Sequence, residues 1–193
     1  MTDAVPPTTL PFTGNPEADA LLATDPLAML IGFALDQQVT VQKAFAGPYE
    51  LRRRIGTLDA AAIATMDPEA LGVAFRTPPA LHRFPGNMAG RVRDLCAVVA
   101  EQYDGDAARV WTGATDARNL RARLMALPGI GEMKATTILA LLAKQFGVRP
   151  AGWEAELPDH PTLGDVDSAE ALAAYQAGKR AHKAELRAQG KPA

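Results

Sequence analysis

The chain is poor in the residues that build disulfides, metal clusters and membrane spans. Its 193 residues include a single cysteine, Cys96, and three histidines that lie far apart, His82, His160 and His182. One cysteine excludes an intramolecular disulfide and a four-cysteine iron–sulfur site, and the scattered histidines predict no zinc site. No apolar run approaches the ~18 residues that span a bilayer, and the N-terminus lacks the pattern of a signal peptide. We therefore expect a soluble, cytoplasmic protein with no metal and no organic cofactor.

Acidic and basic side chains are nearly balanced in number but unevenly distributed. The net charge is −2. Residues 1–36 carry −5 and contain no lysine or arginine, residues 37–149 carry +5, and residues 150–193 carry −2. Affinity for phosphates depends on the local potential and not on the total charge, so the basic middle section is compatible with a nucleic-acid partner. An ordinary mixed-charge surface has the same composition, so charge alone does not decide.

Helix signals dominate the chain, and no alternating pattern of β-branched residues suggests a strand. Hydrophobic residues make up 48 % and charged residues 22 %, which is typical of globular proteins. Residues 1–26 are interpreted as an extended N-terminal lead-in, residues 27–150 as a helical region, and residues 151–193 as an irregular segment followed by a C-terminal helix that packs back on the core. The predicted fold class is all-α, a globular helical array of two lobes around a cleft.

Hydrophobic periodicity and breakers locate the main helices. Gly47-Pro48 is expected to break one helix into two, and the prolines of residues 76–86 predict a loop. Helices are expected over residues 27–38, 41–46, 49–55, 59–66, 67–75, 87–103, 106–111, 116–126, 132–146 and 168–188.

The most informative segment is residues 124–139, which is predicted to form a helix, a tight turn and a second helix. Gly129 and Gly131 allow a positive φ and a close approach, and Ile130 between them is suited to plug into the helix pair. The turn exposes backbone N–H groups at the positive end of the next helix, which is an anion site that suits a DNA phosphate. A purely structural helix hairpin is the alternative.

This segment resembles the helix-hairpin-helix of the HhH-GPD superfamily of DNA glycosylases, which includes endonuclease III and the 3-methyladenine glycosylases. The resemblance implies base-excision repair, with damaged double-stranded DNA as the partner of a monomeric protein. It also allows a monovalent cation at the hairpin. The DNA-binding residues that it implies here are Gly129, Ile130, Gly131 and Lys134.

A second stretch, residues 34–41, resembles the glutamine-rich end of an early helix in the same family. Gln38 matches the side chain that fills the gap left by an extruded nucleotide, and Gln37 is adjacent to it. Glutamine suits this role because it is long, neutral and able to hydrogen-bond an orphaned base edge. A solvated helix end is the alternative interpretation.

Two carboxylates compete as the catalytic group that the family places near the reacting sugar. Cleavage passes through an oxocarbenium-like sugar, which a carboxylate can stabilise. The family's aspartate segment is missing here, and its slot holds either Glu154 or, without a gap, Ala151. Asp36, beside the glutamine pair, is the other candidate. The alternative for Glu154 is one acid of a solvated acidic loop with Glu156 and Asp159, and the alternative for Asp36 is a helix-terminal acid paired to an arginine.

Met133 occupies the slot of the lysine that family members with strand-nicking activity use as a Schiff-base nucleophile. Lys134 is one residue later, about 100° around the helix, and is expected to face phosphate. The expected enzyme is therefore a monofunctional glycosylase with water as the nucleophile. A DNA-binding protein that has kept the scaffold without catalysis is the alternative.

Several further side chains are assigned by residue type. His82 and Arg83, in the predicted loop, are candidates for contacts with the DNA backbone. Trp153 is the preferred candidate for stacking on a flipped base, and Phe84 is the second. The run of residues 52–54 is interpreted as a solvated basic face. The basic tail from Lys179 onward is interpreted as an aid to solubility.

Overall fold

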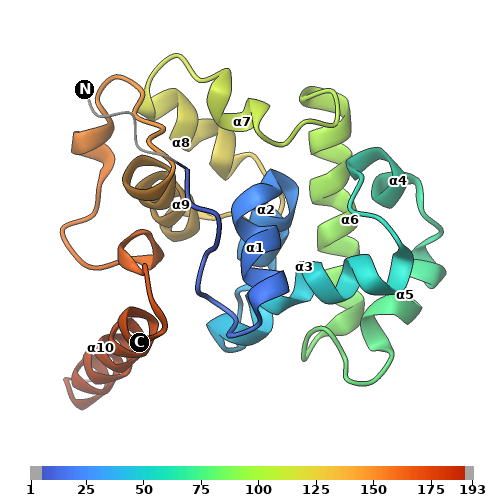
Figure 1. Ribbon diagram of the computed structural model, residues 1–193, viewed down its shortest axis with the longest axis horizontal. Helices are drawn as coiled ribbons and strands as arrows, with labels where there is room; N and C mark the ends of the chain where they lie inside the picture. The colour runs from blue at the N-terminus through green and yellow to red at the C-terminus, as the bar shows by residue number, and fades with distance from the viewer. Residues whose placement is uncertain (1–5, 190–193) are drawn as a thin grey trace.

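The computed structural model describes residues 6–189 of the chain, and within this part it is all-helical (Figure 1). Helix accounts for 66 % and strand is absent from the described residues, which confirms the all-α class. Two short 3₁₀ segments accompany the α-helices, η1 at Trp153–Glu156 and η2 at Leu163–Asp165. The α-helices are α1 Pro16–Thr24, α2 Pro26–Leu35, α3 Val41–Ile55, α4 Ala60–Thr65, α5 Pro68–Arg76, α6 Pro85–Gln102, α7 Arg109–Thr112, α8 Ala117–Met125, α9 Glu132–Gln145 and α10 Ala169–Ala188.

Most of these helices begin at a polar side chain that accepts hydrogen bonds from the first free N–H groups of the helix. Asp25 accepts from Leu27 and Ala28 at the start of α2, and Pro26 follows it at the first helical position. The other caps of this kind are Asn15, Thr40, Asp59, Asp67, Asp116 and Ser168. Local sequence therefore fixes where these helices start.

The N-terminal segment differs from the extended lead-in expected over residues 1–26. Residues Pro16–Thr24 form α1, which Asn15 caps, and Leu10 and Phe12 ahead of it are fully buried. The Phe12 ring packs edge-on against Phe45 of α3, with their centroids 5.1 Å apart. Asn15-Pro16 is the same kind of start signal as Asp25-Pro26, and it places this segment in the core.

Helices α2 and α3 pack closely against each other, and here two expectations were wrong. Helix α2 ends at Leu35, three residues before the expected end. Helix α3 continues through Pro48 as one helix, without the expected break. A side chain on Gly47 would meet Leu35 Cδ1 at 2.5 Å, so this glycine lets the two helices approach closely. The local sequence at Pro48 favours a break, yet α3 stays continuous where it packs closely against α2.

The core extends from these helices in two directions (Figure 1). Helix α6 packs on α4, α5 and α2, and buries Cys96, whose thiol pKa burial raises to about 12. Helices α8 and α9 pack on each other, and α9 also contacts η1 and η2. Nine of the ten residues of α2 are buried between these groups. The end of α2 is therefore held firmly relative to its neighbours.

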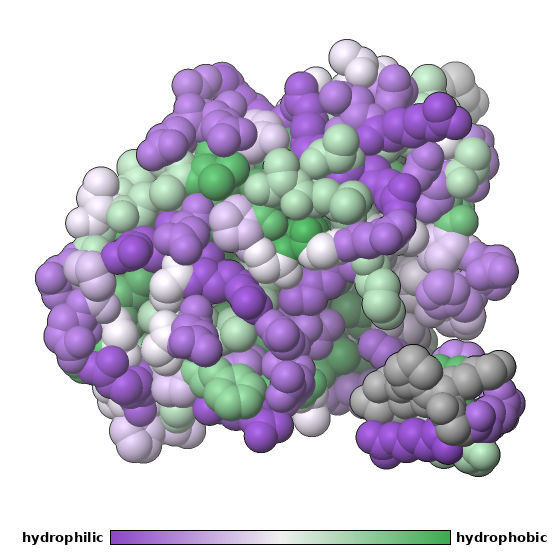
Figure 2. All heavy atoms as spheres, turned by 180° about the vertical axis from the view of Figure 1, so that it is seen from behind, coloured by the Kyte–Doolittle hydropathy of each residue, from purple (hydrophilic) through white to green (hydrophobic). Residues whose placement is uncertain are grey.

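Helix α10 packs back on the core only through its first half. Leu172 is buried and Tyr175 packs against the core, whereas most later residues of the helix are exposed. Figure 2, seen from behind, shows this helix standing out from the body of the molecule.

Length and apolar composition give no single described helix the character of a membrane span. Helices α1 and α2 meet these criteria only as a pair, bent by 112°.

Candidate nucleic-acid interface

The hairpin between α8 and α9 is a tight turn with one left-handed residue. Gly129 has φ +86°, and a side chain there would meet Arg91 Cδ at 2.5 Å. Ile130 is 3 % exposed and plugs into the helix pair, as expected. Gly131 differs from expectation, since its φ of −87° is open to any residue. A Cβ on Gly131 would have no neighbour within 4 Å, so the space in front of this residue is free.

Gly131 is the N-cap of α9 and has no side chain that could accept its first N–H groups. The first helical N–H groups, those of Glu132, Met133 and Lys134, have no partner inside the helix. They point out of the turn together with the positive end of a 14-residue helix. The Met133 side chain beside them is 81 % exposed. The turn thus presents backbone donors at an open surface, which is the geometry that an anion requires.

The end of α2 forms the second part of the site. Asp36 is the C-cap residue, and Gln37 and Gln38 follow it as exposed residues outside the helix. Gln38 adopts a left-handed conformation with φ +57°. The Gln37 side chain accepts a hydrogen bond from the Arg91 guanidinium. The two glutamines therefore stand on a sharp turn and not on a helix face.

Arg91 of α6 joins the two parts. Its guanidinium binds the side chain of Gln37, and its aliphatic carbons lie under Gly129, so a single side chain touches both the α2 end and the hairpin turn. The sequence analysis missed this residue. Arg91 lies three residues after Met88 and one before Val92, at the edge of the apolar face of α6, and an arginine at that edge is the signal that could have identified it.

His82 is buried and bonded, contrary to its expected contact with DNA. Its Nε2–H donates to the Gln37 carbonyl at 3.0 Å, and its Nδ1 accepts from the N–H of Phe84, also at 3.0 Å. These two bonds fix the neutral tautomer, and burial lowers the pKa of the ring. His82 therefore supports the glutamine turn from behind. Arg83 next to it is exposed, with its guanidinium 4.8 Å from the centre of the exposed Phe84 ring.

Lys134 also differs from expectation, because it turns inward instead of facing solvent. Its ammonium donates to the carbonyl of Gly129 at 3.1 Å and is 3.4 Å from the carbonyl of Ala34. The side chain therefore bridges the hairpin turn and the last turn of α2. A lysine is long enough to reach across the helix pair, and the free carbonyls at the end of α2 attract its charge.

Asp36 and Lys134 form an electrostatic pair inside this cluster. Burial raises the pKa of Asp36, against the charges of Lys179 and Lys134, which lower it. Burial lowers the pKa of Lys134 to about 8, against the charge of Asp36, which raises it. Each group is thus shifted toward its neutral form, so desolvation outweighs the attraction between them. A carboxyl with a raised pKa takes up a proton at a higher pH than a surface aspartate does.

Glu154 and Trp153 lie in η1, which contacts both α8 and α9. The Arg149 guanidinium lies 5.2 Å from the centre of the Trp153 ring. Glu156 of η1 shares Arg121 with Glu132, the first residue of α9, so this segment also comes near the hairpin. Glu154 itself is exposed and, within the described residues, makes no side-chain bond to the turn. Asp36 is tied to the turn more directly, because Lys134 bonds both the Gly129 carbonyl and the Ala34 carbonyl two residues before Asp36.

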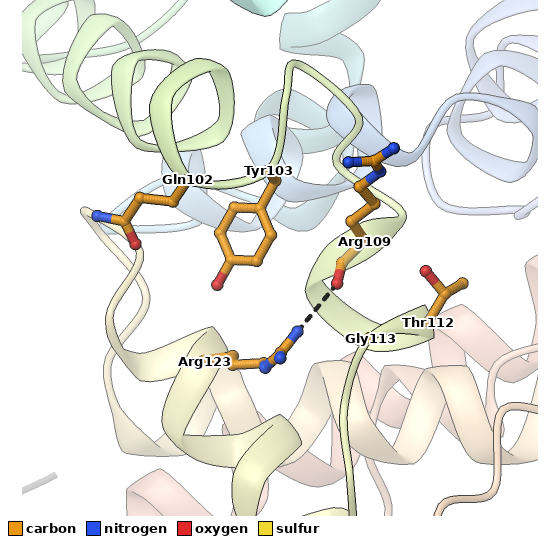
Figure 3. A pocket seen from close by; sticks show the side chains of 6 residues that line it. All are labelled: Gln102, Tyr103, Arg109, Thr112, Gly113 and Arg123. Atoms are coloured by element: carbon orange, nitrogen blue, oxygen red, sulfur yellow. Dashed lines mark hydrogen bonds between the residues drawn. The ribbon is translucent and has the colours of Figure 1, made fainter.

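A separate hollow of about 530 Å³ lies between the end of α6, α7 and α8 (Figure 3). Arg123 points into it but donates to the Arg109 carbonyl at 3.1 Å, and the Arg109 side chain pairs with Asp104. The residues that line it are Gln102, Tyr103, Arg109, Thr112, Gly113 and Arg123. None of them was singled out in the sequence. The hollow is open, and its arginines already have partners, so the cluster around Asp36 remains the stronger candidate site.

Comparison of the chain with protein-family models and with curated proteins finds no match.

Proposed function

We propose that this protein binds damaged duplex DNA through the α8–α9 hairpin and hydrolyses the N-glycosidic bond of a damaged base. The observation that carries the proposal is the meeting of two segments about 90 residues apart, both singled out in the sequence by resemblance to the same family. Lys134 contacts both the hairpin carbonyl of Gly129 and the α2 carbonyl of Ala34, and Arg91 links Gln37 to the same turn. A hairpin that served only to pack helices would not need polar residues gathered beside it.

In this proposal the hairpin anchors one phosphate and the glutamine turn lies against the bases. The open N–H groups of α9 hold the phosphate, a contact that positions the protein without reading sequence. Gln37 and Gln38 are exposed on a turn whose backbone His82 fixes. They fill the place of the extruded nucleotide, with the helices on either side forming two lobes around a DNA-binding cleft.

Asp36 is the proposed catalytic carboxylate. When the glycosidic bond breaks, its electron pair leaves with the base and positive charge develops on the sugar. An ionised Asp36 stabilises that charge and accepts a proton from the water that adds to the sugar carbon. The partly buried position strengthens this electrostatic effect relative to water. Burial raises the pKa of Asp36, and the charges of Lys179 and Lys134 oppose this shift and favour the ionised form.

The proposed reaction ends with an abasic site and an intact strand. Met133 is the exposed residue of the first turn of α9, and a thioether cannot form a Schiff base. Burial lowers the pKa of the Lys134 amine to about 8, but bonds to the carbonyls of Gly129 and Ala34 hold the amine inward.

A second candidate is a DNA-binding protein without catalysis. It is favoured by one observation, that Glu154, one of the two residues that fit the family's aspartate slot, is exposed, and the other, Ala151, carries no acid. The two functions are separated by incubating the protein with a panel of duplexes carrying uracil, alkylated purines or oxidised bases, followed by alkali. Excision produces alkali-labile breaks at the lesion, whereas a non-catalytic protein binds the duplexes and leaves every one of them intact.

A further inference from the structure

We propose that the C-terminal helix α10 is a second DNA-backbone-binding element, which places Lys179 and Arg180 on the phosphates next to the one that the hairpin holds. This inference rests on the proposed DNA binding and extends it to a helix that the sequence left without a role.

The first half of α10 is anchored beside the candidate site. Gln176 and Gln42 exchange two side-chain hydrogen bonds, of 2.9 and 3.3 Å, which tie α10 to the first turn of α3. Leu172 is buried and Tyr175 packs against the core on the same face, at the three- and four-residue spacing of a helix. The helix is therefore fixed in direction where it leaves the body.

Lys179 is the next residue on this inward face, and it lies next to the cluster. Its ammonium is 5.3 Å from the centre of the Tyr175 ring, and it is close enough to Asp36 for its charge to act on that carboxyl. The charge of Lys134 also acts on Asp36, and the Lys134 ammonium donates to the Gly129 carbonyl of the hairpin. Lys179 therefore lies near the end of α2, because Gln42, which holds Gln176, follows Gln38 by four residues.

Beyond Lys179 the helix projects from the body (Figure 2), and Lys179, Arg180 and Arg187 are exposed. Within residues 6–189, no carboxylate lies within ion-pair distance of Lys179, Arg180 or Arg187, whereas Arg53, Arg76, Arg109 and Arg121 all have such partners. Lys179 and Arg187 are eight residues apart, about 12 Å along the helix. This length covers between three and four nucleotides at about 3.4 Å per phosphate of one strand.

Duplex DNA is the partner that fits these features. The free cations are continuous with the proposed phosphate anchor, and a rigid helix carrying them at fixed spacing suits a regular line of negative charge. A surface that served only solubility would not need two glutamine bonds to hold the helix against the site.

The test measures the salt dependence of duplex binding in the full-length protein. The variant is Lys179→Gln combined with Arg180→Gln, and the matched control is Arg52→Gln combined with Arg53→Gln on the basic face of α3. Both remove two positive charges from exposed or partly exposed helical positions, and circular dichroism verifies that each folds. The probe is a fluorescein-labelled undamaged duplex, followed by anisotropy over a range of salt concentrations.

Each lost phosphate contact reduces the slope of log affinity against log salt by about 0.9. The α10 variant is expected to lose between about 0.9 and 1.8 of slope and to bind at least several-fold more weakly at low salt, while the control retains the wild-type slope. An unchanged slope in the α10 variant overturns the inference, as does an equal loss in the control, which would show an effect of net charge alone. A slope loss seen with RNA or anionic vesicles but not with duplex DNA also overturns it. If the wild type fails to bind duplex DNA at all, the proposed function fails with it.

Discussion

Gly131→Asp separates the fold of the hairpin from its proposed function, because it is expected to leave the protein stable and to abolish phosphate anchoring. Gly131 is the N-cap of α9, its φ of −87° and ψ of −178° suit any residue, and the space for a side chain is empty. Aspartate is among the best N-cap residues, since its carboxylate accepts the free N–H groups of the first turn. In this variant the protein's own carboxylate occupies the position of the DNA phosphate.

The two effects have opposite signs and different sizes. Replacing a glycine cap by aspartate stabilises a helix by a few tenths of a kcal/mol, so the melting temperature of a chain of this length is expected to rise by about 1 °C. A hydrogen bond to a charged group contributes about 1.5–3 kcal/mol, so losing the phosphate contact weakens binding roughly 10- to 100-fold. The slope of log affinity against log salt falls by about 0.9.

Gly129→Ala is expected to lower the stability of the protein, in contrast to Gly131→Asp. At φ +86° an alanine is strained by about 1–2 kcal/mol, and its Cβ displaces Arg91 from under the turn. With the gain from a less flexible unfolded chain subtracted, the variant is expected to lose about 1 kcal/mol, which lowers the melting temperature by roughly 2–4 °C.

The assays are thermal unfolding and anisotropy with a labelled duplex. Asn15→Asp, at the cap of α1, introduces the same charge outside the cluster and serves as the control. If folded Gly131→Asp binds duplex DNA with the wild-type affinity and salt slope, the hairpin has a structural role only and the reasoning is refuted.

The remaining predictions concern the chemistry at Asp36. Asp36→Asn is expected to lower the single-turnover excision rate by orders of magnitude with DNA affinity within a few-fold of wild type, whereas Glu154→Gln, at an exposed position in η1, keeps full activity; the reverse result would move the chemistry to Glu154. Because burial raises the pKa of Asp36, the excision rate is expected to fall on acidification at a higher pH than for an ordinary aspartate, and Lys134→Gln, which removes a cation that lowers this pKa, moves that fall to still higher pH. Burial lowers the pKa of Lys134 to about 8, below its ordinary 10.5, so between these pH values the unfolded chain binds one proton more than the folded chain. The contribution of Lys134 to the free energy of unfolding therefore rises with pH over that window. This rise is expected to disappear from denaturation curves of Lys134→Met. Borohydride is expected to trap no protein on damaged DNA, and a trapped adduct that Lys134→Gln abolishes would instead identify this amine as a nucleophile.

The fold was predictable to the extent that it depends on local signals. Helix starts at Asp25-Pro26 and Asp67-Pro68 combine a side-chain cap with a proline that tolerates the first helical position, and both helices form there. Asn15-Pro16 carries the same signal, but residues 1–16 are rich in proline and threonine, which favoured an extended segment in the sequence analysis. The path of α3 through Pro48 was not predictable in this way, because contact with α2 at Gly47 decides it.

The candidate site was predictable in its backbone and not in its side chains. The glycine spacing identified the hairpin turn, and the resemblance to the family identified the glutamine segment. The inward turn of Lys134 depends on carbonyl groups of α2 that are 100 residues away, and the burial of His82 depends on the Gln37 carbonyl. Arg91 has a role only because Gly129 lies on its aliphatic carbons. Each of these outcomes is set by tertiary contacts that one-dimensional spacing does not contain.

The most direct test of the central claim is single-turnover excision from end-labelled duplexes, each carrying one lesion, with excess protein and with alkali added after quenching. The account predicts strand breaks at one class of lesion, appearing only after alkali, present with the wild-type protein and with Glu154→Gln, and lost with Asp36→Asn. Duplexes that are bound by the wild-type protein and remain intact across the whole panel would contradict it, and would leave a DNA-binding protein without glycosylase activity.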